Sequence, residues 1–168
     1  MKKLILAGLC AALSAAVWAA PVVDGKISEG EYSNSKKVLS GQGLLVWSKD
    51  ADGLTVALKV KTEGWVGVGF GADKMSGAYI FMGYVDGDKA VFSEEKGKGH
   101  RHAPVDKPVA DKSAVTWTKG DTVIEFHVPT AKLPFALGTV PFIAAFSDTA
   151  DLKTFHGDNA DMGSLTIR

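Results

Sequence analysis

Apolar and polar residues alternate along much of this chain with a period of two, which is typical of strands that bury one face. In residues 54–60, Leu54, Val56 and Leu58 share one face, and residues 123–128 alternate in the same way. Further strands are expected at 44–49, 65–70, 78–85, 89–93, 114–119, 140–147 and 164–168. Asp-Gly and Lys-Gly pairs separate several of these segments, as turns do.

About eight or nine short strands at this spacing predict an all-β fold, an antiparallel, immunoglobulin-like β-sandwich. No segment after residue 20 keeps helical spacing for three turns. Residues 94–112 are rich in Lys, Gly, His and Pro and lack a strand pattern, so a long surface loop is expected there. The sequence shows no repeat and no second domain.

The first 19 residues have the pattern of an export signal peptide. Lys2 and Lys3 precede an apolar run from Leu4 to Val17, and small residues stand at 17 and 19 before a cleavage site. This predicts a signal peptide at 1–19, one β-sandwich domain at 20–168, and a periplasmic or secreted protein. No later segment reaches the roughly 18 apolar residues of a membrane-spanning helix, so no integral span is expected in the mature chain.

Composition narrows the function classes. Without Lys2 and Lys3, 17 basic residues stand against 19 acidic ones, a net charge of about −2, which gives no reason to expect nucleic acid as a partner. The single cysteine, Cys10, lies in the signal peptide, so the mature chain has no disulfide and no thiolate chemistry. Covalent-haem, phosphate-loop and serine-hydrolase motifs are absent, and the protein is expected not to be an enzyme.

Residues 64–87 contain two apolar runs joined by a polar corner, and this corner carries Met75. A thioether among Asp73, Lys74 and Ser76 is poorly placed for a core strand, although filling gaps in a core is the usual role of methionine. His156 lies in a loop before the last strand, where a histidine is often simply solvated. A pocket shared by Met75 and His156 would decide the function.

His100 and His102 form an HxH pair that is open either to metal chelation or to a flexible polar tip. Met82 alternates with Ile80 and Tyr84, so both the core and a pocket wall are open to it.

Several motifs in order resemble the DOMON family. They are Asp24-Gly25-Lys26-Ile27 with Glu31-Tyr32, Gly64-Trp65 followed by Met75-Ser76-Gly77-Ala78, Glu125-Phe126 with Pro129, and Phe155-His156-Gly157. The opening also resembles family 9 carbohydrate-binding modules. The sequence departs from the commoner bacterial pattern after Phe92 and at Val128.

The resemblance to haem-binding DOMON members, such as the cytochrome domain of cellobiose dehydrogenase, implies a non-covalent haem b with Met75 and His156 as axial ligands. Apolar walls would come from Trp65, Phe70, Ile80, Met82, Phe142 and Phe146, and alternation alone does not decide which of them line the pocket. Lys74, Arg101 or the HxH loop would meet the propionates. A haem with both axial positions filled transfers electrons, here to an unidentified redox partner protein.

Two rivals stay open from the sequence. A carbohydrate-binding module without a redox role would stack Trp47 or Trp117 on a sugar ring. A periplasmic copper-binding protein would use His100, His102 and nearby methionines, the donor types that copper prefers.

Overall fold

The computed structural model describes residues 20–168, and the signal peptide predicted at 1–19 lies outside the described residues. Within this range the chain forms eleven strands and two short 3-10 helices. In chain order these are β1 (Asn34–Val38), η1 (Leu39–Gly41), β2 (Gly43–Lys49), β3 (Gly53–Val60), β4 (Val66–Phe70), β5 (Tyr79–Asp86), β6 (Lys89–Lys98), β7 (Arg101–Pro104), β8 (Lys112–Thr118), β9 (Asp121–Pro129), η2 (Thr130–Lys132), β10 (Gly138–Phe146) and β11 (Ala160–Ile167).

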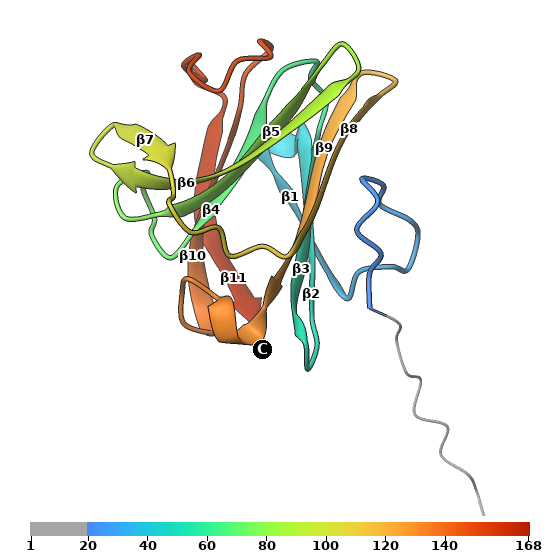
Figure 1. The fold of residues 1–168 in the computed structure, drawn as a ribbon, viewed down its shortest axis with the longest axis vertical. Coiled ribbons are helices and arrows are strands. Elements are labelled where there is room, and N and C mark those ends of the chain that lie inside the picture. Colours follow the sequence, from blue (N-terminus) through green and yellow to red (C-terminus); the bar gives the residue numbers. More distant parts are fainter. Residues whose placement is uncertain (1–19) are drawn as a thin grey trace, which may run out of the picture.

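The strands form two sheets that face each other (Figure 1). The five-stranded sheet has the order β1-β2-β3-β9-β8, and the six-stranded sheet has the order β11-β10-β4-β5-β6-β7. Every neighbouring pair is antiparallel. The predicted antiparallel β-sandwich is therefore confirmed.

Large apolar side chains fill the space between the sheets. Phe81 of β5 stacks on Phe126 of β9 with 4.0 Å between ring centroids, and both side chains are fully buried. Phe70 and Phe142 pack in the same cluster. Burying a side chain of this size contributes roughly 1.5–3 kcal/mol, so this layer is the main source of stability.

The predicted turns have the backbone that hairpins need. Lys119 and Gly120, between β8 and β9, both have positive φ, as in the two-residue type I′ turn whose twist suits antiparallel strands. In residues 20–168 the structure has no helix with the length and apolar character that a membrane crossing requires.

The expectation of a long surface loop at 94–112 is wrong for its first part. Strand β6 continues to Lys98 and pairs with β7, so that 94–104 is mostly hairpin, drawn in yellow-green and yellow in Figure 1. The sequence hides the strand because two of its buried positions, 94 and 95, carry carboxylates. Glu94 is buried and accepts hydrogen bonds from the Tyr79 hydroxyl at 2.7 Å and from the N–H groups of Val109 and Ala110. Buried polar groups of this kind persist because they are fully partnered.

A second buried carboxylate fastens the N-terminal segment to the outer face of the five-stranded sheet. Glu125 of β9 accepts hydrogen bonds from the N–H groups of Asp24 and Gly25 at 2.8 and 2.7 Å and from the Tyr32 hydroxyl. Burial raises the pKa of Glu125, and burial together with the facing carboxylate raises the pKa of Tyr32. The DGKISEGEY opening therefore works as a strap over this sheet.

Candidate functional site

A pocket of about 400 Å³ lies on the outer face of the six-stranded sheet, the face that turns away from the sandwich core. Its floor comes from the outward positions of three adjacent strands. These are Gly67 and Gly69 of β4, Ile80 and Met82 of β5, and Ile143 and Ala145 of β10. The volume lies within the range of small-molecule and cofactor sites, about 300–1,000 Å³.

The two glycines of β4 have no side chain, so the floor of the pocket lies close to the backbone at these positions. A Cβ atom at Gly69 would lie 2.9 Å from a side-chain carbon of Ile143 and 3.1 Å from one of Ile80, and a Cβ at Gly67 would lie 3.1 Å from Met82. A glycine inside a strand weakens the strand and often marks a place where a ligand approaches the backbone closely. The glycines of the GWVGVGF run therefore shape a flat, apolar surface.

Met75 reaches the pocket from the corner between β4 and β5, residues 71–78. Its side chain is half-buried and packs with a small outer cluster of Trp65, Ala78, Ile80 and Met82. The corner closes with a hydrogen bond from the Ala78 N–H to the Met75 carbonyl at 3.1 Å, and Gly77 adopts a positive φ of 92°. The polar residues around Met75 are thus surface residues of a turn, and Met75 itself lines the pocket.

His156 reaches the same pocket from the loop between β10 and β11, residues 147–159. Trp65 at the start of β4 holds this loop. Its indole N–H donates to the Thr154 carbonyl at 3.1 Å, and its backbone N–H donates to the Thr149 carbonyl at 3.2 Å. The rings of Trp65 and His156 meet edge to face at 6.5 Å between centroids.

One atom at this wall lacks a partner. The Nδ1 atom of His156 is buried and has no hydrogen-bond partner among the described residues. Since buried polar atoms in native proteins are nearly always partnered, an orphaned imidazole nitrogen on a pocket wall suits a residue that binds a ligand. Sulfur from Met75 and nitrogen from His156 are together the donor set that holds haem iron in electron-transfer cytochromes.

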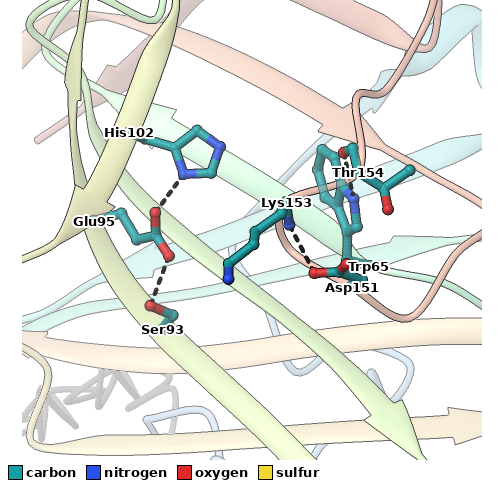
Figure 2. Close-up of polar contacts among 7 residues, drawn as sticks. All are labelled: Trp65, Ser93, Glu95, His102, Asp151, Lys153 and Thr154. Atoms are coloured by element: carbon teal, nitrogen blue, oxygen red, sulfur yellow. Dashed lines mark hydrogen bonds and ion pairs between the residues drawn. The ribbon is translucent and has the colours of Figure 1, made fainter.

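The rim of the pocket is polar and basic. Figure 2 shows the hairpin wall, where Glu95 accepts hydrogen bonds from Ser93 and pairs with His102, and the opposite wall, where Lys153 and Asp151 interact through the Lys153 backbone N–H. Lys74 and Lys153 line the pocket as exposed cations, and His100 and His102 line it from the β6–β7 hairpin. Cationic side chains at this position would favour an anionic group at the mouth.

Of the residues predicted to line the pocket, Met75, His156, Trp65, Ile80 and Met82 do line it, and Phe70 does not. Phe70 shares its face with Val66 and Val68 and is buried between the sheets, and Phe142 and Phe146 lie there as well. Alternation separates the two faces of a strand but does not state which face is the core, so it could not place Phe70 on either side.

The structure gives little support to the two rival hypotheses, a carbohydrate-binding module and a copper-binding protein. Trp47 is buried in the core and donates its indole N–H to the Thr166 carbonyl, so its prediction as a sugar-stacking surface residue is wrong. Trp117 is 45 % exposed on the edge strand β8. His100 and His102 belong to no group of three or more His, Cys, Asp or Glu side chains placed to hold a metal ion in residues 20–168.

Sequence reasoning missed several lining residues. Ile143 and Ala145 alternate with Phe142 and Phe146, so the period-two pattern of β10 contained that information once the core face was known. Lys153 and Phe155 come from a loop, where no periodic signal exists, and Met162 comes from the edge strand β11. Phe155 and Met162 remain 76 % and 66 % exposed at the mouth.

The comparison with known families agrees with this geometry. The sequence profile of the DOMON domain matches residues 39–131, more than half of the chain. The chain belongs to the DOMON domain family. The matched range includes the Met75 corner and the β6–β7 hairpin and ends before the loop that carries His156.

Two solved cytochrome domains share this fold at low sequence identity. The cytochrome b domain of pyranose dehydrogenase from Coprinopsis cinerea aligns with a TM-score of 0.58 and 15% identity, covering 80% of each chain. The cytochrome domain of cellobiose dehydrogenase from Myriococcum thermophilum aligns with a TM-score of 0.53 and 13% identity, covering 75% of each. A family 9 carbohydrate-binding module from Caldicellulosiruptor kristjanssonii, in complex with cellotriose, reaches a TM-score of 0.48 at 12% identity, with 86% of this chain and 80% of that chain covered. No curated protein sequence matches this chain significantly.

Proposed function

We propose that this DOMON domain binds one b-type haem in the outer-face pocket, with Met75 and His156 as the axial ligands, and transfers electrons. The observation that carries the proposal is that these two side chains, from separate loops, line one apolar pocket. The family membership and the likeness of the fold to two cytochrome domains support it.

Each part of the pocket has a distinct task in this proposal. Met75 supplies a thioether from the β4–β5 corner, and His156 supplies an imidazole from the β10–β11 loop. Ile80 and Met82, with the glycines of β4, exclude water from the flat surface between these loops. When bound, a haem with both axial positions filled exchanges single electrons and leaves no position open for oxygen or a substrate.

The wider setting of the protein is part of the same proposal. The signal-like residues 1–19 favour export to the periplasm or beyond, where an electron-transfer protein would need a partner within reach of its pocket. The partner would be another redox protein, and the domain would act as a carrier rather than as an enzyme.

The visible absorption spectrum of the purified protein with added haem tests this function. We expect sharp α and β bands in the reduced state, as for six-coordinate low-spin iron. Met75→Ala and His156→Ala should each shift the spectrum toward high spin, since each removes one axial ligand. His127→Asn is the matched control, because His127 lies on the opposite sheet and pairs with Asp111.

Two results would contradict the proposal. One is a wild-type protein whose reduced spectrum with haem lacks these bands. The other is a haem-free protein that binds cello-oligosaccharides through Trp117, shown by a loss of binding in Trp117→Ala with no loss in Met75→Ala.

A further inference from the structure

Gly97 of strand β6 lies directly beneath the backbone of Met75. A Cβ atom at position 97 would lie 1.7 Å from the Met75 carbonyl oxygen, 2.7 Å from its carbonyl carbon and 3.3 Å from its Cγ. Gly97 is buried within an extended strand and does not have a positive φ. Glycine is therefore required at this position by space and not by backbone conformation.

Hydrogen bonds fasten the Met75 corner to β6 on both sides of this contact. The Gly77 N–H donates to the Gly97 carbonyl, and the Gly97 N–H donates to the Ala78 carbonyl, each at 3.0 Å. The Lys96 ammonium group donates to the Gly77 carbonyl at 2.7 Å. The Met75 corner therefore packs on the β6–β7 hairpin, although about twenty residues separate the two segments along the chain.

The other candidate ligand is held by different residues. His156 lies in a loop whose Thr149 and Thr154 carbonyls accept hydrogen bonds from Trp65, with no contact to β6 among these hydrogen bonds. A disturbance at position 97 should therefore move the sulfur and leave the imidazole in place, which changes the spacing between the two sides of the pocket.

We propose that Gly97 is a positioning residue for the Met75 sulfur, so that the β6–β7 hairpin sets how deep this ligand reaches into the pocket. This inference rests on the proposed function for its role in haem binding, but the placement of Met75 by Gly97 can be tested without haem. In Gly97→Ala the new methyl group displaces the Met75 carbonyl and the root of its side chain.

The haem-free test uses methionine labelled with ¹³C at its methyl group. Residues 20–168 contain three methionines. The methyl signal of Met75 reports on the corner, that of Met82 on the floor, and that of Met162 on the mouth of the pocket. We expect Gly97→Ala to move the Met75 signal by several line widths and the Met162 signal little. Lys89→Ala is the control, because Lys89 is an exposed residue at the other end of β6.

A Met75 signal that stays in place in Gly97→Ala would overturn the inference. Should Gly97→Ala fail to fold, Lys96→Gln carries the test, since it removes the ammonium group that donates to the Gly77 carbonyl and lies over the Tyr79 ring. It should move the Met75 signal by a smaller amount, and an unmoved signal there would equally contradict the positioning role.

The haem-bound readout separates this inference from the proposed function. If haem binds to the wild type, Gly97→Ala should weaken haem binding by roughly 10- to 100-fold, the usual cost of losing a residue that orients a ligand, and should shift the spectrum toward high spin. Lys89→Ala should keep both wild-type values. If the wild type binds no haem, the proposed function fails, while the methyl signals still decide whether Gly97 positions Met75.

Discussion

The two faces of the six-stranded sheet use the same strands for opposite purposes. On β4, Val66, Val68 and Phe70 point into the sandwich, whereas Gly67 and Gly69 point outward. On β5, Phe81 is fully buried against the opposite sheet, whereas Met82 faces the pocket. The inner face is packed with aromatic rings, whereas the outer face has glycines and smaller side chains.

This contrast shows that the pocket is built largely by small side chains, with two loops raised around them. The inner face buries apolar surface and therefore contributes stability. The outer face leaves part of its apolar surface open as the pocket. The two faces should thus respond differently to substitution. Inner changes should lower stability, and outer changes should mainly alter ligand binding.

The largest expected effect is on the inner face. Phe81→Ala removes a fully buried ring that stacks on Phe126, and it should lower the free energy of unfolding by about 3–5 kcal/mol. Urea unfolding of the haem-free protein measures this. A loss below about 1 kcal/mol would show that the inter-sheet layer is not the stabilising face.

Filling the floor should give the next largest effect. Gly69→Val places a branched side chain against Ile143 and Ile80 and should cost about 1–3 kcal/mol in stability through overpacking. Haem binding should fall more steeply than stability, because the new side chain occupies the flat surface. Haem titration followed by absorbance measures the affinity, and unchanged affinity would break the distinction between the two faces.

A smaller effect is expected at the wall that carries His156. Trp65→Phe keeps an aromatic ring but removes the indole N–H that donates to the Thr154 carbonyl. The loss of one partly buried hydrogen bond should cost about 1 kcal/mol. The haem spectrum should show partial loss of the histidine ligand, and a spectrum identical to that of the wild type would mean that Trp65 does not hold the loop.

The outer face of the five-stranded sheet offers the smallest test, because the N-terminal strap covers it instead of a pocket. Burial raises the pKa of Glu125 above the usual 4.5. Between the unfolded pKa and the raised folded pKa of Glu125, the folded protein binds more protons than the unfolded chain. The contribution of this carboxyl group to stability is therefore present below the unfolded pKa and is lost as pH rises through the folded pKa.

Glu125→Gln should remove this dependence. As pH rises above the usual pKa of 4.5, the stability of the wild type should fall relative to that of the variant. Asp111 has the opposite sign at lower pH, because the His127 side chain holds the pKa of Asp111 below its usual 3.8, so that its contribution to stability is lost as pH falls through the folded pKa. Urea unfolding at a series of pH values measures the Glu125 dependence, and parallel curves for wild type and Glu125→Gln would refute the prediction.

Part of the fold could be read from local patterns and part could not. The strands at 54–60 and 123–128 were predictable because a buried face imposes a period of two. The β6–β7 hairpin was not predictable, because Glu94 is buried with partners that come from elsewhere in the fold, Tyr79 of β5 and the N–H groups at 109–110. The place of Phe70 in the core was not predictable either, since a period fixes two faces without saying what each one contacts.

The sequence by itself determined the strand-rich fold class, the candidate ligands Met75 and His156, and the family resemblance, because propensities, periodicity and motifs are local properties. Only the tertiary structure decided that these two side chains line one pocket on the outer face of a sheet, and that Gly97 supports one of them. Such placements depend on contacts between segments that are distant along the chain, and these contacts exist only after the sheets have packed.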